Sequence, residues 1–279
     1  MITGAGGLIG SHLINSLNRG DYSLHTVSSS LKNNNTTTID FSDDWSTEDL
    51  PENIDCIIHL SQSRNFRDFP GKAREIFFVN TLSTLKLIDW AVKKGVKKFI
   101  YASSAGVYGN NDNPFTEDER IIYKKELGFY LGTKYCSEII LDNYTSLIDI
   151  LQMRFIFVYG KGQDRNMLIP RLVDNIKNKI PITLQGENGL KTNPIHVSDA
   201  VRAIESAFTV EGSHTFNIGG DEVLSLRQIG ETIGTLLKIP AQFIMQDQPA
   251  KNLIGDITKL KSILTAPQIK FEQGIKELL

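Results

Sequence analysis

The sequence contains no long apolar run and no strong excess of charge. No stretch of about 18 consecutive apolar residues occurs, which argues against a membrane-spanning helix, and no basic and then apolar leader stands at Met1. The 30 basic and 32 acidic residues give a formal net charge of −2, so nothing indicates general attraction to nucleic acid or to an anionic membrane. We therefore expect a soluble cytoplasmic protein that binds neither nucleic acid nor membranes.

Cysteine and histidine are too few and too scattered to indicate a disulfide framework or a metal centre. The two cysteines, Cys56 and Cys136, form no CxxC pair, so we expect free thiols in a reducing compartment. No two of the five histidines have the spacing of metal ligands, so we expect no metal site. His196 and Asp199 are instead expected to fix the start of a helix.

Short apolar segments alternate along the chain with segments of helical periodicity. Predicted strands are residues 24–27, 37–40, 54–60, 97–103, 148–155 and 181–184. Predicted helices are residues 7–20, 74–95, 130–146, 167–179 and 196–208. This order predicts an α/β fold with a doubly wound parallel sheet, a Rossmann fold. We expect a dinucleotide-binding domain over residues 1–158, with 193–210 packing back onto it, and a smaller C-terminal α/β substrate lobe over 159–279.

The chain opens with a glycine-rich loop. Gly4, Gly7 and Gly10 form a GxxGxxG pattern that leads into the first predicted helix. Glycines allow a tight turn and a close approach to a pyrophosphate, and the helix N-terminus offers free N–H groups to the anion. Only three residues precede Gly4, although five or six are typical of a strand, so we expect a short first strand that anchors the loop weakly.

The end of the second strand bears on the choice between NAD and NADP. An acidic residue there binds the adenine ribose hydroxyls and repels a 2′-phosphate. This sequence has Ser28 and then Lys32, with no carboxylate, so NADP is as compatible as NAD; a solvated loop without a cofactor role is the alternative. Asp40, after the third strand, is a candidate contact for the adenine amino group.

Two serines and a tyrosine–lysine pair are candidates for catalysis. Ser103 and Ser104 end a predicted strand, and Tyr130 and Lys134 stand four residues apart on a predicted helix. Residues at this spacing project from the same helical face, so an ammonium group can lower the pKa of a phenol and make it a competent base. An unrelated surface tyrosine and lysine is the alternative interpretation.

Taken together, these motifs identify a resemblance to a known family. The sequence resembles the extended short-chain dehydrogenase/reductase family, the NAD-dependent epimerases and dehydratases that act largely on nucleotide sugars. The resemblance rests on TGAGGLIGSH, IDCIIHL, FVNT, YASSAGVYG, YLGTK, RFIFVYG, PIHVSDAVRAI and FNIGG, which together span almost the whole chain.

The resemblance implies roles for individual residues. Ser104 would orient the substrate, with Ser103 as the second candidate for this role. Tyr130 would exchange a proton with the substrate while the nicotinamide exchanges a hydride. Lys134 would hold the nicotinamide ribose and adjust the pKa of Tyr130. The implied cofactor-binding residues are Gly4, Gly7, Leu8, Ile9, Gly10, Ser28, Asp40, Phe41, Leu60, Ser61, Asn80, Tyr130 and Lys134. Asn80 is expected either to bridge helix and active site or to make a helix-start hydrogen bond.

The residues after Ser104 bear on the type of reaction. Dehydratases of this family commonly place an Asp-Glu pair there, whereas this chain has Ala105 and Gly106, which carry no protons. We therefore expect no dehydratase. The SSAxVYG form resembles the 4-epimerases, and a ketoreductase of a keto-sugar or another small carbonyl compound is equally possible chemically.

The expected substrate contacts are Ser104, Phe157 and Lys191. The residues that bind the diphosphate of a nucleotide sugar in this family are replaced by other residue types in this chain. Phe157 stands in the place of an asparagine, Thr192 beside Lys191 stands in the place of an arginine, and no arginine follows Arg227. A lysine is no bidentate clamp for phosphate. A nucleotide-linked sugar is still favoured; otherwise the diphosphate is held differently or the substrate is of another kind.

Two further expectations concern function and assembly. A non-catalytic dinucleotide-binding sensor or scaffold is the alternative of another class, because the first strand is short and the arginines are missing. RNFRDF is expected to be a loop over the active site and not an RNA-binding segment. A homodimer is possible through the helices that carry FVNTLSTLKLIDW and YLGTKYCSEII.

Overall fold

A computed structural model describes residues 1–20, 22–30, 35–121 and 124–279, and Lys32 lies outside the described residues. The chain forms two compact units, which are described separately. The first consists of Met1–Val107, Ile121–Arg154 and Ile204–Phe216, and the second of Tyr108–Arg120, Phe155–Ala203 and Asn217–Leu279. The assignment of residues 159–279 to the substrate stays a prediction.

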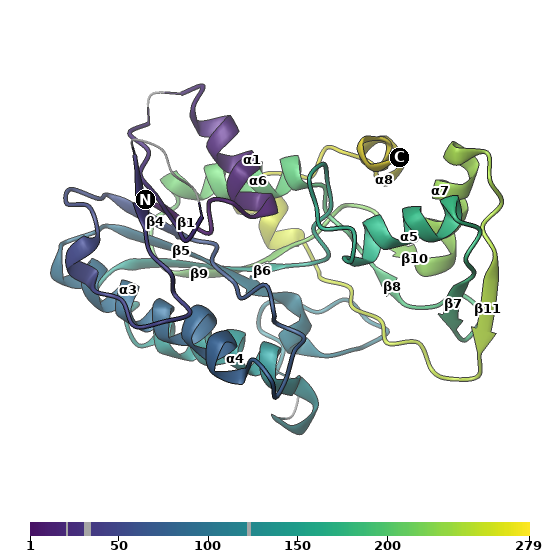
Figure 1. Ribbon diagram of the computed structural model, residues 1–279, viewed down its shortest axis with the longest axis horizontal. Helices are drawn as coiled ribbons and strands as arrows, with labels where there is room; N and C mark the ends of the chain where they lie inside the picture. The colour runs from purple at the N-terminus through teal and green to yellow at the C-terminus, as the bar shows by residue number, and fades with distance from the viewer. Residues whose placement is uncertain (21, 31–34, 122–123) are drawn as a thin grey trace. The chain divides into compact units, whose positions relative to one another are not determined.

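A seven-stranded parallel sheet organises the fold, which confirms the predicted α/β class (Figure 1). Its strands are β1 (Ile2–Thr3), β2 (Thr26–Ser28), β3 (Thr36–Thr38), β4 (Cys56–His59), β5 (Lys98–Ser104), β6 (Asp149–Phe155) and β9 (His214–Ile218). The strand order is β3-β2-β1-β4-β5-β6-β9. The order reverses between β1 and β4, and in such sheets ligands bind at the carboxyl ends of the strands near this point.

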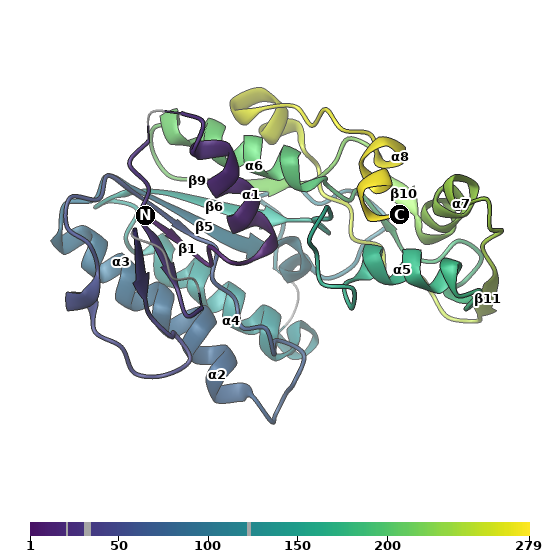
Figure 2. The same ribbon diagram turned by 45° about the horizontal axis from the view of Figure 1, so that its top comes forward.

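Helices cover both faces of the sheet in the first unit. They are α1 (Leu8–Leu17), α2 (Ala73–Phe77), the π-helical turn η2 (Phe78–Leu82), α3 (Ser83–Lys93) and α4 (Lys124–Asp142). In Figures 1 and 2, α1 lies on one face and α3 and α4 lie on the other. Gly128, at φ +67°, interrupts α4 near its start.

The single helix predicted over 74–95 consists of three segments in the structure. Two side chains near its middle bond the backbone carbonyl four residues earlier: Ser83 Oγ donates to Val79 O at 2.6 Å and Thr84 Oγ1 to Asn80 O at 2.8 Å. Hydroxyl groups that bond in this way compete with the regular helical pattern. They accompany the change to a π-helical turn, which is a frequent feature of functional sites.

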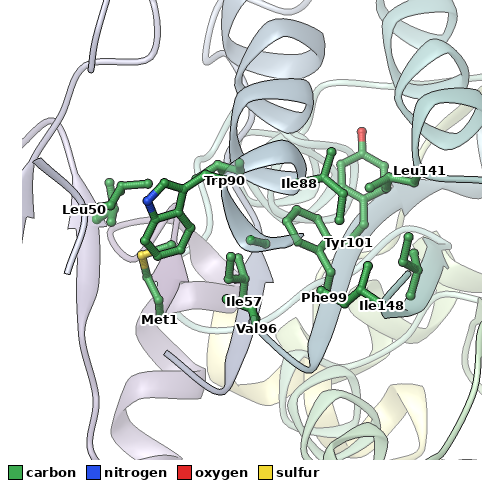
Figure 3. Packing of buried hydrophobic residues seen from close by; sticks show 14 of the residues in the cluster. Met1, Leu50, Ile57, Ile88, Trp90, Val96, Phe99, Tyr101, Leu141 and Ile148 are labelled. Carbon is green, nitrogen blue, oxygen red and sulfur yellow. The ribbon is translucent and has the colours of Figure 1, made fainter. Parts of the chain in front are cut away.

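The core of the first unit lies between the central strands and α3 (Figure 3). Ile57 of β4 and Phe99 of β5 are fully buried, and Ile88 and Trp90 of α3 pack in the same cluster. Strands at the centre of a doubly wound sheet are covered on both faces, which explains the apolar runs Cys56–Ile58 in β4 and Phe99–Ala102 in β5.

The first strand is short, as predicted, but hydrogen bonds join it to both neighbours. Ile2 N donates to His25 O at 2.8 Å on one side, and Leu60 N donates to Thr3 O at 3.3 Å on the other. The hydroxyl of Thr3 also lies 2.6 Å from Nδ1 of His59, and both side chains are fully buried. Cross-strand contacts of this kind anchor the two residues of β1 in the sheet.

The second unit contains two small sheets and several helices. Its helices are α5 (Leu168–Lys177), most of α6 (Val197–Ser206), α7 (Leu226–Leu237) and α8 (Phe271–Gly274). The strand β7 (Ile182–Gln185) pairs in parallel with β11 (Phe243–Gln246), and β8 (Lys191–Thr192) pairs antiparallel with β10 (Leu224–Ser225). Short turns of 3-10 or π-helix are η1 (Thr47–Asp49), η3 (Ala105–Tyr108), η4 (Ala207–Thr209), η5 (Leu260–Leu264) and η6 (Ile275–Leu278).

Sequence signals explain how these elements begin. Ser225 and Gln228 form a capping box at the start of α7, a pairing that satisfies two free N–H groups. Nδ1 of His196 accepts the N–H of Ser198 at 3.3 Å at the start of α6, as predicted. The carboxylate of Asp199 instead accepts the N–H groups of Gln268 and Ile269, so this part of the prediction is wrong. Among the helices in the described part of the chain, none is both long enough and apolar enough to cross a lipid bilayer.

Candidate active site

The glycine-rich loop packs directly against the end of β4. Gly4 lies between β1 and α1 with φ +69°, and a Cβ there would come within 2.7 Å of the backbone of Leu60 and Ser61. A Cβ on Gly10 would come within 2.4 Å of the carbonyl oxygen of Gly4. The chain path therefore requires glycine at both positions, and it brings Leu60 and Ser61, two predicted cofactor contacts, beside the loop.

The first turn of α1 suits an anionic ligand. Gly7 is the N-cap residue, no side chain caps the helix, and no acidic residue lies in its first turn. Leu8, Ile9 and Gly10 form that turn, where free backbone N–H groups and the helix dipole favour negative charge. The residues present thus fit the pyrophosphate of a dinucleotide.

If a dinucleotide binds in the way that is usual for this fold, the side chains that follow β2 and β3 lie near its adenosine half. Ser28 ends β2 and its Oγ accepts the N–H of Ser30 at 3.2 Å. Asp40 accepts hydrogen bonds from N and Oγ of Ser42, at 2.9 and 2.7 Å. Phe41 is buried and its ring lies 4.9 Å from that of Trp45. The absence of a carboxylate at the end of β2 keeps both NAD and NADP compatible with this site.

The two serines at the end of β5 differ in their surroundings. Ser103 is only 5% exposed, and its hydroxyl has no hydrogen-bond partner in the part of the chain that the structure describes. Ser104 is half-buried, and its Oγ accepts the N–H of Gly106 at 3.2 Å. That bond uses an acceptor site of Ser104, so the hydroxyl hydrogen is able to point toward a ligand.

The hydroxyl of Tyr130 bonds a residue that follows β4. It donates to Oε1 of Gln62 at 2.7 Å, and the ring of Phe66 lies 4.9 Å from the ring of Tyr130. Burial raises the pKa of Tyr130 above its ordinary value. The sequence led us to expect a pKa lowered by Lys134; instead, desolvation of the phenolate raises the pKa of Tyr130.

Lys134 lies one turn after Tyr130 on α4 and is enclosed by protein. It is 2% exposed, its Nζ donates to Ala102 O at 2.8 Å, and Nζ lies 5.1 Å from the ring centroid of Tyr101. Burial lowers the pKa of Lys134 to about 8, and the charge of Glu138 opposes this change. The bond to Ala102 fixes the ammonium group against β5, two residues before Ser104.

Asn80 connects three segments around this cluster. Its Oδ1 accepts the N–H of Ser63 at 3.0 Å and its Nδ2 donates to Thr133 Oγ1 at 3.0 Å. Because Asn80 is fully buried and its amide bonds protein groups on both sides, this geometry favours the bridging interpretation over a helix-start bond. Its cofactor contact stays a prediction.

The predicted substrate residues Phe157 and Lys191 belong to the second unit. Phe157 is half-buried and has φ +37°, a conformation that is uncommon for a bulky residue. Lys191 is exposed, and its backbone N–H donates to Oδ1 of Asn252 at 2.7 Å. Thr192 is fully buried, and its hydroxyl has no partner among the residues described.

The model of a family described as the NAD dependent epimerase/dehydratase family matches residues 1–219. This chain belongs to the NAD-dependent epimerase/dehydratase family. The resemblance predicted from the sequence motifs is confirmed.

Within the epimerase/dehydratase family, relatives with different reactions match comparably well. The dTDP-4-dehydro-6-deoxyglucose reductase of Escherichia coli is 28% identical over 246 residues, or 81% of this chain and 74% of the reductase. The UDP-glucuronate 4-epimerase of Thermodesulfobacterium geofontis is 27% identical over 230 residues, or 80% of this chain and 71% of the epimerase. The structure of MoeE5 in complex with UDP-glucuronic acid and NAD has a TM-score of 0.85 and 25% identity, covering 99% of this chain and 96% of MoeE5.

Two features of the site were not predicted from the sequence. One is Gln62, whose contact with Tyr130 depends on the path of the loop after β4. The other is a buried ion pair beside Lys134, in which Arg154 donates to both carboxylate oxygens of Glu138, at 3.0 and 2.8 Å. The spacing of Tyr130, Lys134 and Glu138, four residues apart in turn, was a signal that could have identified the second feature.

Proposed function

We propose that this member of the epimerase/dehydratase family is an NAD(P)-dependent epimerase. Its substrate would be a nucleotide-linked sugar, which it would epimerise through a transient ketone. The observation that carries the proposal is the placement of Tyr130 and Lys134 one turn apart on α4, with Lys134 bonded to β5 two residues before Ser104. MoeE5 with bound UDP-glucuronic acid and NAD supports the choice of cofactor and of substrate class.

The chain's own residues would hold the substrate and move its proton. A bound nicotinamide would supply the hydride acceptor and donor for the carbon that carries the reacting hydroxyl. Tyr130 takes the proton of that hydroxyl and gives it back, Ser104 donates a hydrogen bond to the same oxygen, and Lys134 supplies the positive charge that opposes the effect of burial on the phenol. Inversion requires the ketone to present its other face before the hydride returns.

The cofactor would be held chiefly by the loop between β1 and α1. Gly4, Gly7 and the first turn of α1 would receive the pyrophosphate, and Ser28 and Asp40 would face the adenosine. Either NAD or NADP is compatible with Ser28. We also propose a cytoplasmic location, which the free thiols of Cys56 and Cys136 support.

A ketoreductase is the second candidate, because one observation favours it specifically. The positions that carry phosphate-binding asparagine and arginine in nucleotide-sugar epimerases hold Phe157 and Thr192 here, and Thr192 is fully buried. The E. coli reductase also matches over four fifths of this chain. A keto-sugar or another small carbonyl compound would then be reduced by the same three catalytic residues.

A panel of UDP-, dTDP-, GDP- and CDP-sugars, each incubated with the oxidised and reduced forms of NAD and NADP, tests the proposal. We expect a new sugar epimer by NMR, with NAD neither consumed nor released. Stoichiometric consumption of NADH or NADPH with a keto-sugar would favour the reductase. Cofactor binding in calorimetry without turnover of any compound would contradict both enzymes and favour the sensor.

A further inference from the structure

Gln62 places a second polar group beside the reacting phenol. Its side chain is exposed, and its Oε1 accepts the hydroxyl of Tyr130 at 2.7 Å. Its Nε2 donates to no other residue in the described part of the chain. An amide carries an acceptor and two N–H donors, so both donors are available to a ligand that reaches Tyr130.

The loop that carries Gln62 is held in place by the residues that follow it. The N–H of Ser63 is bonded to Oδ1 of Asn80, and Oγ of Ser63 donates to Oε1 of Glu75 at 2.7 Å. The Nδ2 group of Asn65 also donates to both oxygens of Glu75, at 3.0 Å each. The loop is thus held against α2 and η2, and its contact with Tyr130 is part of an ordered network.

The chemistry of the proposed reaction needs hydrogen-bond donors at this place. Removal of the hydroxyl proton before the hydride leaves, and addition of a hydride to the ketone on its return, build negative charge on that oxygen. Ser104 offers one donor to that oxygen, and a preorganised second donor stabilises the charge further. An amide is also uncharged, so it adds no repulsion to the phenolate that forms when Tyr130 gives up its proton.

We propose that Gln62 is a further catalytic residue, whose amide N–H group donates a hydrogen bond to the substrate oxygen that exchanges its proton with Tyr130. The inference rests on the proposed function, since it assigns a ligand contact within that same site. The carbonyl of Gln62 holds the phenol hydroxyl in the structure, and the substrate oxygen takes the place beside both groups. Gln62 thereby selects substrates whose reacting oxygen accepts two donors at once, as a hydroxyl or a ketone does.

Three variants separate this role from a merely structural one. Gln62→Leu keeps the approximate volume and removes both donors, and Gln62→Glu keeps the acceptor but replaces the donors with a negative charge. Ser63→Ala is the matched control, because it removes one bond between the loop and Glu75. The bonds from Asn65 to Glu75 and from the backbone N–H at position 63 to Asn80 remain and keep the amide of Gln62 in place. Circular dichroism and thermal unfolding establish that each variant is folded.

The first measurement needs no turnover. In protein labelled with 3-fluorotyrosine, the fluorine resonance of Tyr130 is the one missing from Tyr130→Phe. We expect this resonance to shift in Gln62→Leu and Gln62→Glu and to stay in place in Ser63→Ala. An unchanged resonance in both Gln62 variants would overturn the contact from which the proposal is drawn.

The second measurement is the kcat and KM of each variant, with NAD and the sugar nucleotide of the panel that wild type converts fastest. We expect kcat to fall at least about tenfold in Gln62→Leu, and further in Gln62→Glu, with KM within about threefold. Ser63→Ala should keep kcat within about threefold. If Gln62→Leu loses no more than Ser63→Ala while Tyr130→Phe is inactive, only the role of Gln62 is overturned. If Tyr130→Phe keeps its turnover, the proposed function is overturned as well.

Discussion

The buried amide of Asn80 in η2 donates to the hydroxyl of Thr133 in α4 over 3.0 Å. The hydroxyl of Thr133 in turn donates to the carbonyl of Tyr130 at 2.7 Å, and Thr133 directly precedes Lys134. The carbonyl oxygen of the same amide accepts the N–H of Ser63 in the loop after β4. One side chain therefore sets the positions of the loop and of the helix that carries the candidate acid and base.

Replacement of this residue should affect stability and activity together. In Asn80→Ala the buried N–H of Ser63 loses its partner, and an unsatisfied buried group costs about 1–3 kcal/mol. We expect the free energy of unfolding to fall by that amount, measured by urea denaturation, and kcat to fall as α4 shifts. Asn143→Ala is the control, because Asn143 is exposed and makes a single bond to Ile139 O. An equally small effect of both substitutions would contradict the bridging role.

The buried ammonium of Lys134 should make stability depend on alkaline pH. Its pKa is about 8 in the folded chain and about 10.4 in an unfolded chain, so between these values the unfolded chain binds more protons. The free energy of unfolding therefore rises with pH across this window, by at most about 3 kcal/mol. Lys134→Met lacks this pH dependence. The free energy of unfolding of the variant, relative to that of wild type, should therefore be highest at pH 7 and lowest near pH 10.

Urea denaturation of both proteins at pH 7, 8, 9 and 10, at constant ionic strength, measures this difference. Titration of every other group is common to the two proteins, so the change in their difference reports Lys134 alone. Parallel stability profiles would mean that Lys134 is solvated in the folded chain, contrary to its 2% exposure.

The glycine loop offers a test of close packing. A Cβ on Gly10 meets the carbonyl of Gly4 at 2.4 Å, whereas a Cβ on Gly132 in α4 has no atom within 4 Å. Gly10→Ala should destabilise the chain by about 1–3 kcal/mol and weaken binding of NAD in calorimetry. Gly132→Ala should leave stability unchanged or raise it by up to about 1 kcal/mol. Equal stability of the two variants would show that the loop accommodates the added methyl group without a loss in the free energy of unfolding.

The choice between NAD and NADP can be tested at the end of β2. In Ser28→Asp a carboxylate would repel the 2′-phosphate of NADP and accept a bond from the ribose of NAD. We expect the Kd of NADP to rise at least about tenfold, equivalent to about 1.4 kcal/mol, while that of NAD stays constant or falls. Ser30→Asp, two residues farther on at an exposed position, is the control. Equal changes for both cofactors would place Ser28 away from the ribose.

Local patterns in the sequence were enough to predict the framework of the first unit. The apolar runs of β4 and β5 and the glycines before α1 have a direct physical cause in burial and in close backbone contact. The contact of Gln62 with Tyr130 joins residues 68 positions apart, and no local pattern encodes it. The π-helical turn was missed because helical periodicity continues through it, and no pattern of apolar residues reveals the bonds from the hydroxyls of Ser83 and Thr84 to the backbone.

The pairing of β7 with β11 could not be predicted from local sequence patterns either. These strands have four residues each and lie about 60 positions apart, and β11 has exposed side chains at three of its four positions. Periodicity gives little signal for a strand of this kind. The burial of Lys134 could not be predicted from the local sequence either, because it results from the packing of α4 on β5 around Tyr101.

The proton transfer assigned to Tyr130 is tested most directly by Tyr130→Phe, assayed for turnover of the active sugar nucleotide and for NAD binding. Phenylalanine keeps the ring and its contact with Phe66 but has no proton to exchange. The account predicts a fall in kcat of at least about 100-fold, with the Kd of NAD within about threefold of wild type. Turnover at the wild-type rate in this variant would contradict it.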